Sequence, residues 1–132
     1  MGKGKRKMRD YAPEHYAEVA NELIETIPSL KHIKEAGNSI CYLVSDKRKK
    51  DKGKNVWADC DPVSEANKWA MPFDYLITVY PDGQMLDDEH FKILMHHELL
   101  HIGTSGSTVG HDIDEFMEIA DMYGLHWAED AL

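Results

Sequence analysis

The residues best suited to chemistry lie at His97-Glu98-Leu99-Leu100-His101, which has the pattern H-E-x-x-H. In an α-helix of about 3.6 residues per turn, His97 and His101 project from nearly the same side, one turn apart. Two imidazoles at this spacing can bind one zinc ion. Glu98 projects about 100° away from His97, so its carboxylate stays out of the coordination shell but near a water beside the metal. The segment therefore predicts two zinc ligands, His97 and His101, and a general base, Glu98.

A third ligand is expected after the motif, because catalytic zinc usually has three protein ligands and an open position. His111 lies ten residues beyond His101, a step that permits a helix end, a turn and a return. It follows Gly110, where the chain bends freely, and an imidazole suits this metal. We therefore predict His111 as the third ligand, with Glu115 as the alternative.

The other histidines and the cysteines carry no predicted chemistry. His96 projects about 100° away from His97, and we expect a structural or rim position for it. His15 and His32 have no partner at ligand spacing and are expected at the surface. Cys41 and Cys60 lack C-x-x-C spacing, so we expect small buried side chains in strands.

Length and composition predict one domain. The chain has 132 residues, of which 42% are hydrophobic. Its longest apolar run is far shorter than the ~20 residues that cross a bilayer, and no apolar segment follows the basic start. We expect a flexible basic tail at residues 1–10, a single domain at residues 11–132, no contact with a membrane and a cytoplasmic location.

The charge is divided unevenly along the chain. The net charge is −9, which excludes a domain that binds nucleic acid over its whole surface. Lys and Arg are nevertheless concentrated in two clusters, Lys3, Lys5, Arg6, Lys7 and Arg9, and then Lys47, Arg48, Lys49, Lys50, Lys52 and Lys54. We expect a solvated tail and a solvated loop there, with weak phosphate contact as the alternative.

The residues before the motif predict one helix and three strands. Apolar residues recur at steps of three and four between Pro13 and Pro28, as in an amphipathic helix. Strands are expected at residues 39–45, 55–60 and 73–80, with a basic turn or hairpin loop at 46–54 and a short helix at 64–69. The last of these strands is rich in aromatic and β-branched residues.

Two helices are expected around the motif. The first begins after the acids Asp87, Asp88 and Glu89, which suit a helix N-terminus, and ends at Gly103. A Gly/Ser/Thr loop follows at residues 104–110. Asp112 is then a plausible N-cap of the last helix, which ends at Gly124. The order of elements predicts an α+β fold.

The chain resembles the phage metallopeptidase family, a group of small zincin-like proteins. The resemblance covers about the last two thirds of the sequence, including His97-Glu98-Leu99-Leu100-His101-Ile102-Gly103 and His111-Asp112-Ile113-Asp114-Glu115-Phe116. Its other parts are Gly53–Ala58, Lys68-Trp69, Phe73–Val79 and Tyr123–Trp127.

The resemblance implies a minimal zincin-like fold, SprT-like in plan. An N-terminal helix would lie on a small three-stranded sheet, followed by the H-E-x-x-H helix and a C-terminal helix. It implies a zinc-dependent peptidase with a peptide or protein substrate, His97 and His101 as ligands and Glu98 as the catalytic acid or base. Two alternatives remain. One is a non-proteolytic zinc module that binds nucleic acid or a partner, and the other is a different zinc hydrolase. A deaminase is disfavoured because its H-x-E and P-C-x-x-C signature is absent.

Overall fold

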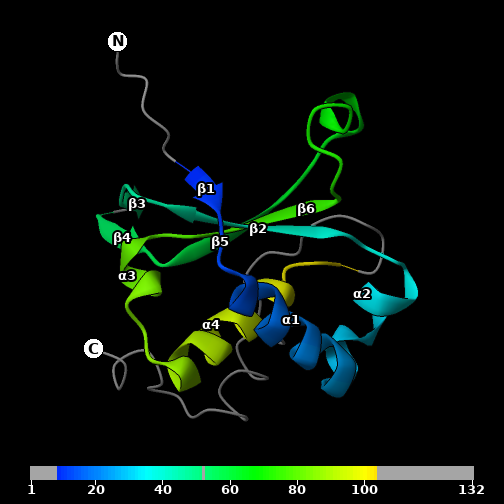
Figure 1. The fold of residues 1–132 in the computed structure, drawn as a ribbon, viewed down its shortest axis with the longest axis horizontal. Helices are drawn as coiled ribbons and strands as arrows, with labels where there is room; N and C mark the ends of the chain where they lie inside the picture. Colours follow the sequence, from blue (N-terminus) through cyan, green and yellow to red (C-terminus); the bar gives the residue numbers. More distant parts are fainter. Residues whose placement is uncertain (1–8, 52, 104–132) are drawn as a thin grey trace.

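A sheet covers one side of a layer of helices in the computed structural model, which describes residues 9–51 and 53–103 (Figure 1). The helices are α1 (Glu14–Thr26), α2 (Lys31–Glu35), α3 (Pro81–Gln84) and α4 (Asp88–Leu99), with 3₁₀ turns η1 (Pro28–Leu30) and η2 (Glu65–Asn67). The strands are β1 (Arg9–Tyr11), β2 (Ile40–Ser45), β3 (Lys49–Asp51), β4 (Lys54–Val56), β5 (Ala58–Pro62) and β6 (Tyr75–Val79). The α+β class expected from the sequence is confirmed.

The main sheet has the strand order β1-β2-β6-β5. β2 and β6 are parallel, whereas β1 pairs with β2 and β5 pairs with β6 in antiparallel fashion. β6 is therefore an interior strand, and its residues Tyr75, Ile77 and Val79 are at most 1% exposed. This agrees with the aromatic and β-branched composition that made residues 73–80 the clearest strand in the sequence.

The sheet has four strands rather than the three expected. The additional strand, β1, includes Arg9 and Asp10, which we had placed in the tail. All three β1 residues are exposed, so this strand has no buried alternating face that a sequence pattern could reveal. The division into a tail and one domain stays a prediction, as does the C-terminal helix, which lies outside the described residues.

The segment expected as one strand at residues 55–60 is divided between two sheets. β3 and β4 form a separate two-stranded hairpin, whereas β5 joins the main sheet directly after Trp57. The basic segment at residues 46–54, which we expected as a turn or hairpin loop, instead contains β3 and the first residue of β4. Gly53 has φ of +80° in the hairpin turn, a conformation that glycine adopts without steric cost.

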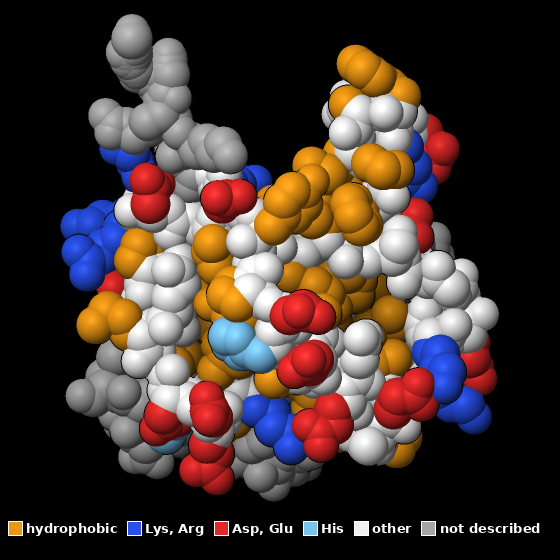
Figure 2. All heavy atoms as spheres, in the orientation of Figure 1, with side chains coloured by type: hydrophobic (Ala, Val, Ile, Leu, Met, Phe, Trp, Pro, Cys, Tyr) orange, Lys and Arg blue, Asp and Glu red, His pale blue; other side chains and the backbone are white. Residues whose placement is uncertain are grey.

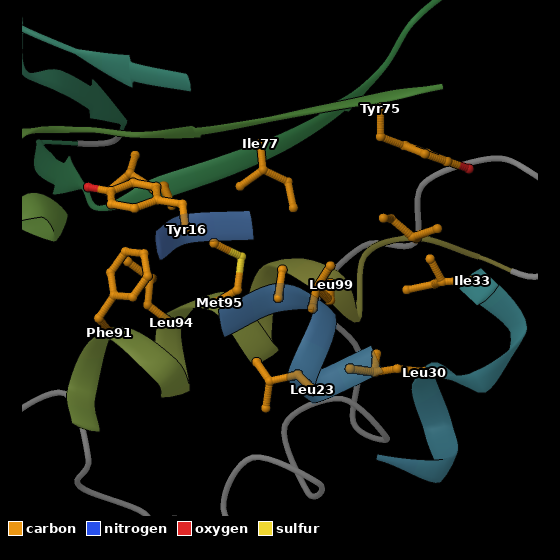
Figure 3. Packing of buried hydrophobic residues seen from close by; sticks show 14 residues of the cluster. Tyr16, Leu23, Leu30, Ile33, Tyr75, Ile77, Phe91, Leu94, Met95 and Leu99 are labelled. Atoms are coloured by element: carbon orange, nitrogen blue, oxygen red, sulfur yellow. The ribbon is translucent and has the colours of Figure 1, made fainter. Parts of the chain in front are cut away.

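The core lies between the sheet and the helices α1 and α4 (Figure 3). α1 buries Tyr16, Ala20 and Leu23, as its amphipathic pattern predicted. Tyr16 contacts Phe91 of α4, with 4.6 Å between ring centroids. Met95 of α4 points towards Ile77 of β6. These contacts fix how α4 lies beneath the sheet, and the end of α4 carries His97 and Glu98.

Candidate metal site

The start of α4 is fixed by its N-cap. The Asp87 carboxylate accepts a hydrogen bond from the backbone N–H of His90 at 2.8 Å, and the same oxygen lies 2.7 Å from His90 Nδ1. The backbone bond is the main reason that the pKa of Asp87 falls below its usual value. The predicted acidic start of this helix is therefore confirmed, with Asp87 as the cap.

Three side chains of the motif meet at the other end of α4. The nearest ligand atoms of His97, Glu98 and His101 all lie within 4.8 Å of one another. The two imidazole rings are 5.2 Å apart between centroids and inclined by 80°. Ligands of one zinc ion lie within about 4 Å of each other, since each bond is about 2.1 Å long. Small side-chain rotations would therefore bring the two imidazole nitrogens onto one divalent ion, with the Glu98 carboxylate beside it.

The helix ends earlier than expected. α4 closes at Leu99, and the chain continues in tighter turns in which His101 N–H bonds to Glu98 O and Ile102 N–H bonds to Leu99 O, both at 3.1 Å. Gly103 is therefore not the helix terminator that the sequence suggested. Such i→i+3 bonds are common in a last turn. They keep His101 close to His97 even though it lies beyond the α-helix.

The motif is oriented so that Glu98 is inside and the imidazoles are half-buried. Glu98 is 4% exposed, whereas His97 and His101 are intermediate. The negative charge of Glu98 also contributes to raising the pKa of the Cys60 thiol on β5, after burial as the main cause. Glu98 therefore lies near enough to Cys60 for its charge to act on the thiol, and α4 contacts β5.

Two other histidines support this region. His96 is fully buried, which confirms a structural position. His32 is not the surface residue we expected, because it is half-buried and its Nε2 lies 2.7 Å from the carbonyl oxygen of Ile102. That contact holds the chain immediately after His101. No local pattern marks His32 for this role, since its partner is seventy residues away.

His111 and Glu115 lie outside the described residues. The structure brings together His97, Glu98 and His101, and the identity of a further ligand stays a prediction.

Comparison with known families identifies the chain. A family model described as "Putative phage metallopeptidase" matches residues 9–131. The chain belongs to this family. The match confirms the resemblance seen in the motif segments and extends it to β1 and α1. No curated protein and no solved structure gives a significant match. None of the helices in residues 9–51 and 53–103 has the length and hydropathy needed to cross a bilayer.

We predict that the alkylation rate of the Cys60 thiol depends on the charge of Glu98. Burial raises the pKa of both Cys41 and Cys60, so in the native protein at pH 8 each has less thiolate than in the unfolded chain. Glu98→Gln removes a negative charge near Cys60, so alkylation of Cys60 should become faster relative to Cys41. The increase should stay below about tenfold, or one pKa unit, because burial is the larger cause.

The measurement is peptide mapping by mass spectrometry after timed iodoacetamide treatment in EDTA. Cys41 serves as the internal reference in every sample. An unchanged ratio between the two cysteines in Glu98→Gln would contradict the proximity of the Glu98 carboxylate to Cys60.

Proposed function

We propose that this protein is a zinc-dependent peptidase in which His97, His101 and His111 bind the metal and Glu98 is the general base. The observation that carries the proposal is the group at the end of α4 and in the turn after it. Ligand atoms of two imidazoles and a carboxylate lie there within 4.8 Å of one another, in a chain that belongs to the phage metallopeptidase family. Zinc bound there would supply Lewis acidity, which lowers the pKa of a water molecule to about 7 and polarises a carbonyl group.

The burial of Glu98 and its proximity to both imidazoles support the proposed role in proton transfer. Its carboxylate is next to both imidazoles yet belongs to a residue that is only 4% exposed. Little bulk water therefore competes for its oxygens. In the proposed reaction one oxygen accepts a proton from the attacking water and later donates it to the amine of the leaving peptide. The half-buried imidazoles keep the same position throughout, because the core contacts of α4 fix the helix.

The edge strand β5 is the proposed support for the substrate backbone. Within the described residues β5 pairs with β6 alone, and it contacts α4. Tyr80 N–H bonds to Trp57 O at 2.9 Å, and Val63 N–H bonds to Asp74 O at 2.9 Å. Because hydrogen-bonded and non-bonded pairs alternate in an antiparallel ladder, the backbone groups of Ala58 and Cys60 point away from β6. An extended peptide could add there as a further strand.

We predict that Glu98→Gln abolishes hydrolysis while zinc binding is retained. Glutamine keeps the size and hydrogen-bonding capacity of the side chain but cannot accept the proton. Zinc content by elemental analysis should stay near the wild-type value, and cleavage of an internally quenched peptide library should fall by at least about 100-fold, the lower range for general-base catalysis.

His90→Gln is the matched control, since it alters a histidine of the same helix two turns before the motif. It should leave both readouts nearly unchanged. Equal turnover in Glu98→Gln and wild type would refute the mechanism. Zinc bound by a wild-type protein that cleaves no peptide would instead favour the non-proteolytic module.

We predict that His111→Ala weakens zinc binding and that Glu115→Ala does not. Removal of one of three protein ligands should lower zinc affinity by about tenfold or more, as seen even for residues that only support a metal ligand. Competition with a chromogenic chelator measures this directly. If Glu115→Ala weakens zinc binding and His111→Ala does not, Glu115 is the ligand. If neither variant changes zinc affinity, neither residue is a ligand and the prediction is wrong.

We predict that Cys60→Pro impairs peptide cleavage more than Cys60→Ala does. Proline removes the backbone N–H that points away from β6, a position where an edge strand tolerates it. Loss of one hydrogen bond to the substrate should reduce kcat/KM by about two- to tenfold. Zinc content and urea unfolding of the two variants check that site and fold persist. Identical kcat/KM values would show that β5 does not hold the substrate backbone.

A further inference from the structure

The short helix α2 contacts the segment that follows the motif. Its residue His32 lies with Nε2 2.7 Å from the carbonyl oxygen of Ile102, seventy positions later in the chain. A carbonyl oxygen only accepts hydrogen bonds, so Nε2 carries the hydrogen of this bond. Figure 1 shows α2 beside the end of the described chain. The bond therefore joins the N-terminal part of the fold to the residue directly after His101.

The two sides of α2 have different surroundings. Ile33 is 1% exposed, points into the core (Figure 3) and belongs to the same apolar cluster as Ile102. On the other side Lys34 is exposed and pairs with Glu25 of α1. Figure 2 shows positive and negative side chains interspersed over this part of the surface. Burial of Ile33 thus fixes α2 in the fold, and the half-buried His32 is held with it.

The turn that carries His101 has weak local restraints. α4 ends at Leu99, and beyond it the N–H groups of His101 and Ile102 make i→i+3 bonds of 3.1 Å. Such bonds have poorer geometry than those of an α-helix. The Ile102 side chain is 1% exposed, but apolar burial has no direction and does not set how the peptide group turns. The bond from His32 does set it, because hydrogen bonds weaken steeply when they are bent.

We propose that His32 is a positioning residue for the metal ligand His101, an inference that rests on the proposed zinc site. Neighbouring Cα atoms are about 3.8 Å apart, so a fixed peptide group at Ile102 leaves the backbone of His101 little freedom. The rings of His97 and His101, 5.2 Å apart between centroids, are then held near each other before a metal binds. A ligand binds more weakly in proportion as the competent arrangement is less populated, so loss of the bond should weaken zinc binding.

Zinc affinity, measured by competition with a chromogenic chelator, tests the proposal. His32→Phe keeps a ring but loses the N–H donor, and His32→Ala loses both. Each should bind zinc about two- to tenfold more weakly than wild type, the range expected for one hydrogen bond. His32→Gln can place an amide N–H near the position of Nε2 and should restore most of the affinity. The large and small replacements disturb packing in opposite ways, so a shared loss points to the missing donor.

Lys34→Met is the matched control, because it removes the 2.6 Å ion pair between Lys34 and Glu25 on the exposed side of the same helix. An exposed pair of this kind contributes little to stability, and the variant should bind zinc as the wild type does. Urea unfolding of the metal-free proteins checks that all four variants are folded.

Amide exchange measured by NMR in EDTA gives a second readout, without metal or substrate. The N–H groups of His101 and Ile102 should exchange faster in His32→Phe and His32→Ala than in wild type, because the turn opens more often. The N–H of Met95, inside α4, should exchange at the wild-type rate in both variants.

Wild-type zinc affinity in both His32→Phe and His32→Ala would overturn the proposal. An equal loss in Lys34→Met, or a His32→Gln variant as weak as His32→Ala, would overturn it as well. The readout is zinc binding and not hydrolysis, so a protein that binds zinc but cleaves no peptide would refute the proposed peptidase and leave the role of His32 intact. A wild-type protein that binds no zinc would refute both.

Discussion

Burial of one side of α4 is the constraint on which the candidate site depends. Phe91, Leu94, Met95 and Leu99 lie in the core between this helix, α1 and the sheet. Each fully buried side chain of this kind contributes about 1.5–3 kcal/mol relative to an exposed one. Rotation of α4 about its axis would expose several of them at once. The core therefore fixes the rotation of the helix and, with it, the directions in which His97, Glu98 and His101 project.

The same constraint gives the polar residues of α4 different degrees of burial. His96 and Glu98 are buried, whereas His97 between them is only partly so. Burying a polar or charged group is costly unless it is compensated, and helices chosen for stability alone rarely carry two such groups within three residues. In α4 the two buried polar side chains lie in the part of the helix that carries the motif. The same part of the helix holds the side chains that suit a metal. Departures from the usual burial pattern, such as buried polar residues, are common at functional sites.

The sequence predicted the parts of the fold that depend on local periodicity. The spacing of apolar residues marks α1 and β6, and the spacing of histidines marks the ligand side of α4. Each pattern lies within a single element and can be seen without knowledge of its neighbours. β1 could not be found in this way, because it is held by backbone pairing with β2 and all its residues are exposed. The tight turns after Leu99 and the contact of His32 with Ile102 also arise from tertiary packing.

The β3–β4 hairpin and the edge strand β5 are held in a fixed arrangement relative to each other. β4 ends at Val56 and β5 begins at Ala58, so Trp57 alone joins them. Its carbonyl oxygen accepts a hydrogen bond from Tyr80 N–H at 2.9 Å and lies so close to Gly83 that a Cβ there would approach it to 2.5 Å. Glycine is therefore required for α3 to pack against this junction. The contact fixes the hairpin relative to β5, and Asp82, the neighbour of Gly83, binds the hairpin through Arg48 and Asn55. A single short helix thus sets the position of both the β3–β4 hairpin and β5.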